Sequence, residues 1–180
     1  MKLPVYFRFI LALALIISWA GELAASGNPA VTTIYVVRHG EKMTANPTDK
    51  DPELSPEGQA RAKALAELLK GKKVDALYST NYKRTRNTLQ PLAEAYKLTV
   101  NTYEPQGLAG LKQQILEKYA GKTVVVAGHS NTILSIVEAL GAKKPVAEVP
   151  DSKYDHLFKV TIAADGTATL EASTYGAVTN

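Results

Sequence analysis

The sequence predicts an α/β fold with a mainly parallel sheet, helices on both faces and a C-terminal antiparallel hairpin. Continuous apolar runs alternate four times with amphipathic helical patterns, which is typical of parallel strands joined by helices. The last two apolar runs flank Asp165-Gly166, a dipeptide that favours a tight hairpin turn. No repeat or interdomain linker interrupts this pattern, so residues 27–180 are predicted to form one domain.

The first strand–helix unit shows the pattern most clearly. Val31–Val37 is a run of β-branched and aromatic residues, as expected of a buried strand. Ser55 then suits the N-cap of a helix and Pro56 its first turn. Gly71 follows the last apolar position of this helix and is predicted to end it.

The remaining elements follow the same alternation up to the hairpin. Apolar residues at helical spacing predict helices over residues 82–96, 108–119 and 133–140. The predicted strands between and after them are Val74–Tyr78, Leu98–Tyr103, Thr123–Ala127, Leu157–Ile162 and Thr167–Ser173. The closing pair is expected to add antiparallel strands to the sheet.

The first 26 residues are predicted to be a signal peptide. Lys2 and Arg8 give a basic start, and Phe9–Ala20 is apolar except for Ser18. Twelve helical residues rise only about 18 Å, against a hydrocarbon core of about 30 Å, so a permanent span is disfavoured. We therefore expect a periplasmic or secreted protein that meets the membrane only through its leader. An uncleaved N-terminal anchor is the alternative.

Both Ser18-Trp19-Ala20 and Ala24-Ala25-Ser26 fit a cleavage site, and the second is favoured because the chain would then begin beside Gly27.

Composition sets further limits on the function. Removing 26 of the 180 residues leaves 154, a usual size for one domain, and lowers the net charge from +4 to +3. Such a mild balance does not indicate a nucleic-acid partner. The absence of cysteine excludes disulfides and thiol chemistry.

Chemically active side chains follow the predicted strands at the points where ligands bind in α/β sheets. The segments that follow the first four strands are Arg38-His39-Gly40-Glu41, Ser79 to Arg84, Glu104 and Gly128-His129-Ser130-Asn131. Two of the three histidines of the chain therefore fall on one edge of the sheet, together with two arginines and two acids. Their shared location indicates a site.

These residue types together favour phosphoryl chemistry. An arginine matches the oxygens of a phosphate through paired hydrogen bonds. A neutral imidazole can attack phosphorus and carry the phosphoryl group as a covalent intermediate. A second histidine can stabilise the phosphoryl oxygens, and a carboxyl group can protonate the leaving oxygen.

Four segments also resemble the motifs of the histidine phosphatase (phosphoglycerate mutase-like) superfamily. They occur in the family's order and cover most of the chain from Thr32 to about Leu140. Arg38-His39-Gly40 is similar to the RHG signature, residues 54–60 to the LTxxGxxQA helix start, residues 78–88 to YSSPLxRAxQT, and residues 126–130 to the second-histidine segment. The resemblance implies the fold of the histidine phosphatase superfamily and a phosphatase activity.

Carried over residue by residue, the resemblance implies that His39 is the phosphorylated nucleophile. Arg38, Arg84 and His129 would then bind the phosphate. Arg84 rather than Arg86 stands at the family's arginine position, and Arg86 is interpreted as a charge on a helix face. Glu41 has two interpretations, an acid that orients the first loop or a solvated loop acid.

The proton donor and the second-histidine loop match the family less closely. Glu104 is predicted to be the donor because many members carry an acid after the third strand, and it is the only acid between Tyr96 and Glu117. Other members place an aspartate directly after the second histidine, where this chain has Ser130. Ser130 is predicted to contact the phosphate, with a role only in capping the following helix as the alternative.

The predicted function is therefore that of an exported phosphatase that hydrolyses phosphomonoesters through phosphohistidine at position 39. The expected partner is a small-molecule phosphomonoester or an envelope phosphosugar. No cofactor is expected, and no metal, because no third ligand stands at close spacing to the two histidines. His156 is interpreted as structural or as lying at the rim of the pocket, rather than as catalytic. The alternatives are a phosphomutase and a phosphate-binding module without turnover.

Overall fold

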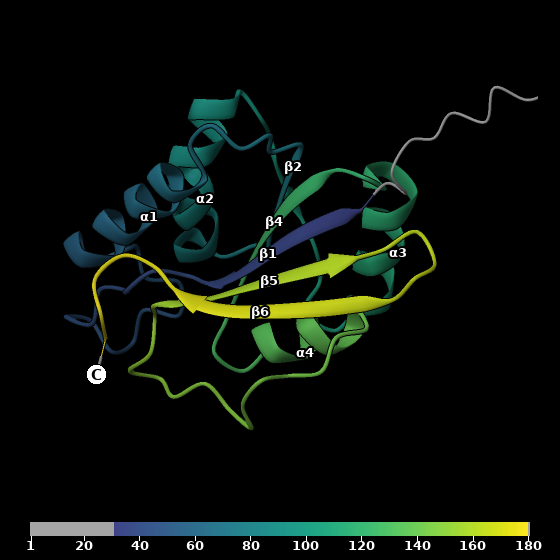
Figure 1. Cartoon of the computed structure of the whole chain (residues 1–180). Helices are drawn as coiled ribbons and strands as arrows, with labels where there is room; N and C mark the ends of the chain where they lie inside the picture. The colour runs from purple at the N-terminus through teal and green to yellow at the C-terminus, as the bar shows by residue number, and fades with distance from the viewer. Residues whose placement is uncertain (1–30, 180) are drawn as a thin grey trace, which may run out of the picture.

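The computed structural model describes residues 31–179 and contains ten regular elements in that range. The strands are β1 (Thr32–Arg38), β2 (Ala76–Ser79), β3 (Val100–Thr102), β4 (Thr123–Gly128), β5 (His156–Ile162) and β6 (Ala168–Thr174). The helices are α1 (Pro56–Leu69), α2 (Lys83–Tyr96), α3 (Leu108–Tyr119) and α4 (Ile133–Ala139). The predicted element types and their order are confirmed (Figure 1).

All six strands form one sheet in the order β3-β2-β4-β1-β5-β6. The pairs among β3, β2, β4 and β1 are parallel, whereas β5 is antiparallel to β1 and β6 is antiparallel to β5. The predicted parallel sheet with a closing antiparallel hairpin is therefore confirmed. In this order β1 lies beside β4, and β4 lies beside β2, so the carboxyl ends of these three strands are neighbours (Figure 1).

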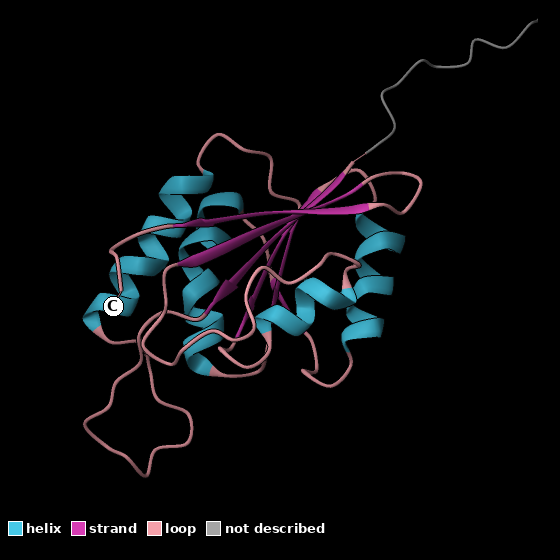
Figure 2. Ribbon diagram, turned by 60° about the horizontal axis from the view of Figure 1, so that its bottom comes forward, coloured by secondary structure: helices cyan, strands magenta, loops and turns pink. Residues whose placement is uncertain are grey.

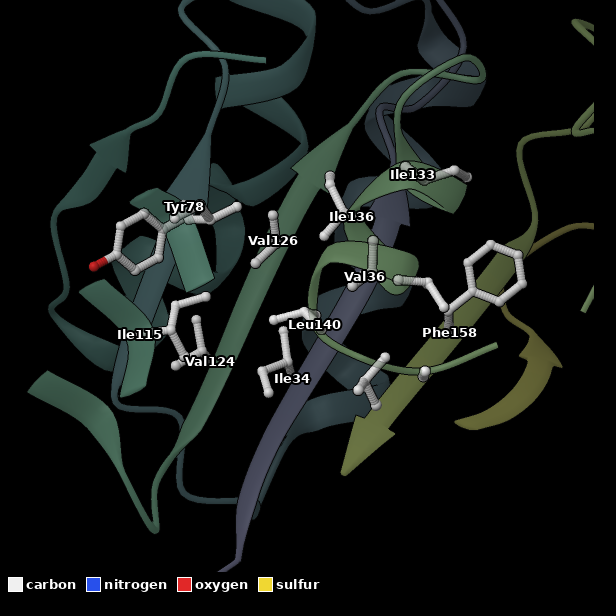
Figure 3. Close-up of a cluster of buried hydrophobic side chains, with 14 of the residues drawn as sticks. Ile34, Val36, Tyr78, Ile115, Val124, Val126, Ile133, Ile136, Leu140 and Phe158 are labelled. Atoms are coloured by element: carbon white, nitrogen blue, oxygen red, sulfur yellow. The ribbon is translucent and has the colours of Figure 1, made fainter. Parts of the chain in front are cut away.

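Helices cover both faces of the sheet, as the edge view in Figure 2 shows. Because side chains alternate along a strand, β1 sends Ile34 and Val36 to one face and Tyr35 and Val37 to the other. The first face packs against α3 and α4, and Figure 3 shows Ile133 and Ile136 of α4 beside residues of β1 and β4. The second face packs against α1 and α2 through buried leucines.

Local sequence signals explain how α1 begins and ends. Ser55 is the N-cap, and its hydroxyl accepts a hydrogen bond from the N–H of Gly58 at 3.3 Å, as the sequence predicts. Pro56 occupies the first turn, where its missing N–H costs nothing. Gly71 follows the C-cap residue Lys70 with a φ of +77°, a conformation that favours glycine.

Two strands differ from their predicted bounds by more than one residue, whereas the ends of the other four lie within one residue of the prediction. β3 spans only Val100–Thr102 instead of Leu98–Tyr103, and it lies at the edge of the sheet, where it pairs with β2 alone. β2 begins at Ala76 rather than Val74 and extends to Ser79. A strand extends only as far as its neighbour offers a backbone to pair with. The apolar pattern of its own sequence does not predict that length.

The predicted signal peptide, residues 1–26, lies outside the described residues. Within residues 31–179, no helix combines the length and apolar character needed to cross a membrane.

Candidate active site

The structure brings five of the six predicted site residues, all except Glu104, to one cavity at the carboxyl edge of the sheet. Arg38 ends β1, His39 follows it, Arg84 lies in the first turn of α2, and His129 follows β4. The N–H of His39 donates to the carbonyl of Gly128 at 2.9 Å, which extends the pairing of β1 with β4 into the site. The cavity has a volume of about 630 Å³ and is lined by Arg38, His39, Lys42, Tyr82, Arg84, Pro105, Gln106, His129, Ser130, Asn131, Thr132, Asp151 and Tyr154.

His39 is buried, and a hydrogen bond at Nδ1 fixes the orientation of its ring. Its Nδ1 lies 2.7 Å from the carbonyl oxygen of Gly40. Because a carbonyl only accepts, Nδ1 carries the ring proton and Nε2 is unprotonated. The Nε of Arg84 donates to this Nε2 at 3.3 Å. Burial lowers the pKa of His39 to about 3, and the positive groups around it act in the same direction.

A short chain of hydrogen bonds supports the loop that carries His39. The N–H of Gly40 donates to the hydroxyl of Thr88 at 2.9 Å, and this hydroxyl donates to the carbonyl of Arg84 at 2.8 Å. The nucleophile loop is thereby tied to the same helix that carries Arg84. The relative positions of His39 and Arg84 therefore depend on α2 as well as on β1.

The guanidinium of Arg38 is almost completely buried, with only 4% of its side chain exposed. Its Nη1 donates to three carbonyls of the loop after α4, those of Pro150, Asp151 and Lys153, at 2.8 to 3.1 Å. The guanidinium also lies 3.9 Å from the ring centre of Tyr154, within range of a cation–π interaction. Its Nε has no hydrogen-bond partner among the described residues.

Arg84 also has a buried donor without a partner. Its Nη1 makes no hydrogen bond within the described part of the chain and lies 3.7 Å from Asp51 Oδ1, which is too long for one. The ring of Tyr82 packs against the guanidinium at 4.4 Å. Buried donors are normally satisfied, so two unpartnered guanidinium nitrogens at one cavity indicate an anion site.

His129 is the second imidazole of the cavity. Its ring centre lies 5.2 Å from that of His39, in an edge-to-face arrangement. Its Nε2 is hydrogen-bonded to the hydroxyl of Thr80 at 2.9 Å. Burial lowers the pKa of His129 to about 4, and Arg84 and Arg38 add to the effect. Both imidazoles are therefore neutral at pH 7.

Ser130 lines the cavity, but the alternative that it caps the following helix is wrong. The N-cap of α4 is Thr132, and the Thr132 hydroxyl accepts a hydrogen bond from the N–H of His129. The hydroxyl of Ser130 instead donates to Asp151 Oδ1 at 2.7 Å. Its predicted contact with a phosphate stays a prediction.

Glu104, the predicted proton donor, is exposed and does not appear among the residues that line the cavity. Its carbonyl accepts a hydrogen bond from the N–H of Gly107 at 2.8 Å, and the next two residues, Pro105 and Gln106, do line the cavity. The structure thus places the loop after β3 at the site without bringing this carboxylate into it. Its catalytic role stays a prediction.

Glu41 orients the first loop, which was one of its two interpretations. Its carboxylate accepts three hydrogen bonds from Arg61 of α1, the shortest at 2.6 Å. Arg61 is buried and also donates to the carbonyls of Tyr175 and Ala177. This buried ion pair joins the loop after His39 to α1 and to the C-terminal segment.

The cavity residues that were not predicted from the sequence include Tyr82, Asp151 and Tyr154. Tyr82 stands within the segment that resembles YSSPLxRAxQT, two residues before Arg84, so its position was available as a signal. The other two belong to the loop between α4 and β5, which carries no recognisable motif. Within residues 31–179, no cluster of three or more His, Cys, Asp or Glu side chains could hold a metal ion.

Comparison with protein families gives one match. The model of the histidine phosphatase superfamily (branch 1) matches residues 34–105, a stretch that contains Arg38, His39, Arg84 and Glu104. The resemblance predicted from the sequence motifs is therefore confirmed. No curated protein sequence matches the chain.

Solved structures share the fold at low sequence identity. The protein histidine phosphatase SixA in complex with tungstate is 17% identical, with a TM-score of 0.62 over 79% of this chain and 96% of that one. A mycobacterial glucosyl-3-phosphoglycerate phosphatase is 16% identical, with a TM-score of 0.62 over 82% and 99%. A phosphoserine phosphatase from Entamoeba histolytica in complex with 3-phosphoglyceric acid is 17% identical, with a TM-score of 0.56 over 81% and 98%.

Proposed function

This chain matches the histidine phosphatase superfamily (branch 1) over residues 34–105 and shares its fold, and on that premise we propose that it hydrolyses phosphomonoesters through phosphohistidine at position 39. One observation carries the proposal. The unprotonated Nε2 of His39 faces a cavity in which two arginines keep unpartnered donors. A nucleophile and an anion site therefore share one cavity.

In the first step, Nε2 of His39 attacks the phosphorus and the bond to the leaving oxygen breaks. The carbonyl oxygen of Gly40, which accepts a hydrogen bond from Nδ1–H, stabilises the positive charge that develops on the ring. In the second step, water attacks the phosphorus, the bond to Nε2 breaks, and inorganic phosphate leaves. His39 returns to its neutral form, ready for another cycle.

The transferred PO₃ group would be held by the free donors of Arg38 and Arg84, with His129 beside them. These groups are fixed before the substrate arrives, by three carbonyls in the case of Arg38 and by the ring of Tyr82 in the case of Arg84. Donors that need no reorganisation are worth more to a transition state than the same donors in water.

The proposal is tested by trapping the intermediate. Purified protein is mixed with p-nitrophenyl phosphate and quenched in alkali, because phosphohistidine is labile in acid. Peptide mapping by mass spectrometry is expected to find one phosphate on the peptide that contains His39. Turnover without phosphate at this position would contradict the proposal, and phosphate binding without turnover would favour the non-catalytic module.

The pH dependence of kcat/KM follows from the burial of the two imidazoles. A protonated histidine cannot attack phosphorus, so activity falls only where His39 gains a proton. Because burial lowers its pKa to about 3, we expect no loss of activity from this group between pH 7 and pH 5, roughly. A histidine with an ordinary pKa would instead give an acidic limb near pH 6.5, about the free value. A pH–rate profile with p-nitrophenyl phosphate distinguishes the two.

The choice of Arg84 over Arg86 gives a second prediction. Arg84→Ala removes the donor that faces His39 and is expected to lower kcat/KM by roughly 10²- to 10³-fold. Arg86→Ala is the matched control, because Arg86 is exposed, lies outside the cavity and has one weak hydrogen bond to Asn81. Steady-state kinetics on both variants show which arginine serves the reaction. Similar losses of kcat/KM in the two variants would contradict the assignment of Arg84.

We further propose that the chain acts outside the cytoplasm. The basic and apolar pattern of residues 1–26 supports export, and a chain without cysteine has no thiol to be oxidised there. The substrate class would then be envelope phosphosugars or other exported phosphomonoesters. Cell fractionation with N-terminal sequencing tests this proposal: a protein that stays in the cytoplasm with an intact N-terminus would contradict export, whereas an intact N-terminus in the membrane fraction would indicate an anchor.

A further inference from the structure

The loop between α4 and β5 brings an unpredicted carboxyl group, that of Asp151, to the cavity. Alkoxide is a poor leaving group, so hydrolysis of an alkyl phosphate needs an acid beside the leaving oxygen. We propose that Asp151 is this acid and donates its proton to the leaving oxygen, an assignment that rests on the phosphatase activity proposed above.

Among the described residues, Asp151 is the only carboxylate that lines the cavity. Three other acids lie near the site, but none of them lines the cavity. Glu41 is bound by Arg61. Asp51 accepts a hydrogen bond from the N–H of Lys83, at the start of α2, and belongs to a neighbouring groove. Glu104 is exposed outside the cavity lining.

Asp151 is held beside the phosphate site by the same arginine that would bind the phosphate. Arg38 Nη1 donates to the carbonyl of Asp151 at 2.9 Å, and Arg38 Nη2 lies 3.5 Å from its Oδ1. The hydroxyl of Ser130 donates to this Oδ1 at 2.7 Å. A phosphate bound to the free Nε of Arg38 would therefore lie beside the same guanidinium group that contacts the Asp151 carboxylate.

The second carboxylate oxygen, Oδ2, remains available to a substrate. None of the residues from 31 to 179 hydrogen-bonds it, and the Asp151 side chain is 92% exposed. The nucleophile lies on the buried side of the cavity, so in-line attack pushes the leaving oxygen away from His39 and toward the open side. The Asp151 carboxylate is exposed and lines the cavity, so it is available to a leaving oxygen on that side.

Substrate binding would also help to protonate Asp151. In the empty site, the hydrogen bond from Ser130 and the charge of Arg38 lower the pKa of this carboxyl group. A bound phosphate dianion recruits these donors and adds negative charge beside the carboxylate, and both effects raise the pKa. The geometry thus couples the arrival of the substrate to the uptake of the proton that the reaction consumes.

The proton balance closes over the two steps. In the first, Nε2 of His39 bonds to phosphorus, the ester P–O bond breaks, and the leaving oxygen takes the proton of Asp151 to form an alcohol. In the second, the Asp151 carboxylate accepts a proton from the attacking water, the P–N bond breaks, and inorganic phosphate leaves. The enzyme is returned to its starting state.

The test compares two substrates that differ in their need for an acid. The p-nitrophenolate ion leaves readily without a proton, whereas the alkoxide of ethyl phosphate does not. Asp151→Asn keeps an acceptor for Ser130 but cannot donate an acidic proton. We expect it to lower kcat/KM by roughly 10²- to 10⁴-fold for ethyl phosphate and by less than about fivefold for p-nitrophenyl phosphate. This ratio reports the steps up to release of the leaving group and does not include the later attack of water, in which Asp151 serves both substrates.

Three variants sharpen this comparison. Glu148→Gln removes an exposed charge from the same loop, outside the cavity, and is the matched control. Asp151→Glu restores a carboxyl group and is expected to recover more ethyl phosphate hydrolysis than Asp151→Asn. Glu104→Gln examines the competing acid. A thermal unfolding midpoint for each variant separates lost chemistry from lost folding.

The assignment is overturned if Asp151→Asn slows both substrates equally or neither, if Asp151→Glu recovers nothing, or if Glu104→Gln shows the selective loss. It is also overturned if the wild type hydrolyses p-nitrophenyl phosphate and not ethyl phosphate, because no acid would then operate. A wild type that turns over neither substrate contradicts the proposed function itself, so the two failures are distinguishable.

Discussion

Replacing His39 with alanine is expected to lower kcat for p-nitrophenyl phosphate by roughly 10⁴- to 10⁶-fold, because the variant loses the atom that forms the bond to phosphorus. Phosphate binding is expected to survive. Arg38 is held by the loop after α4 and Arg84 packs on Tyr82, so each guanidinium keeps a contact that does not involve the imidazole. The expected signature is therefore lost turnover with a retained inhibition constant for inorganic phosphate.

His156→Ala is the matched control for this experiment. His156 is the remaining histidine of the chain, and its ring stacks on Phe158 at 5.5 Å, away from the cavity lining. We expect its kcat to stay within about threefold of the wild type. If His39→Ala retained the wild-type rate, or if the two variants lost activity to the same degree, His39 would have no special part in the reaction.

Gly58→Ala is expected to lower the free energy of unfolding by about 3 kcal/mol. A Cβ added at Gly58 would lie 2.1 Å from the carbonyl oxygen of Glu41 and 2.8 Å from its nitrogen. Both are backbone atoms of the loop that carries His39, so no side-chain rotation relieves the clash. A Cβ added at Gly40, on the other side of the same contact, would lie 2.8 Å from the carbonyl oxygen of Gly58. The loop must move, and we expect activity to fall as well.

Gly110→Ala is the matched control and should act in the opposite direction. Gly110 also lies inside a helix, α3, but no atom stands within 4 Å of its added Cβ. Alanine is the better helix former, so this variant is expected to gain about 0.5–1 kcal/mol. Urea unfolding of both variants measures the difference. A stabilised Gly58→Ala protein would show that the loop and α1 are not in close contact.

The gathering of Arg38, His39, Arg84 and His129 could be predicted because it follows from strand ends. Each of the four residues ends a strand or comes shortly after one, and the carboxyl ends of parallel strands meet at one edge of a sheet. The observed order then places β1 and β2 on either side of β4, so these segments are neighbours. Predicting that these four residues gather did not require knowledge of the path of any loop.

Asp151 and Tyr154 could not be predicted in this way. Their loop reaches the site because Arg38 binds three of its carbonyls, and such contacts accept any sequence that offers a backbone. The sequence could not decide between the two interpretations of Glu41 for a related reason. Its partner, Arg61, is a helix residue 20 positions away, and only the packing of the loop on α1 brings the two charges together.

The sequence by itself determined the alternation of strands and helices, the hairpin and the residues that end each strand, because apolar periodicity and turn chemistry act over a few residues. The tertiary structure alone decided the strand order, the anchored Nδ1 of His39, the unpartnered nitrogens of both arginines and the position of Asp151. These features depend on contacts between segments that are distant along the chain, and no local pattern encodes which backbone groups meet when the layers pack.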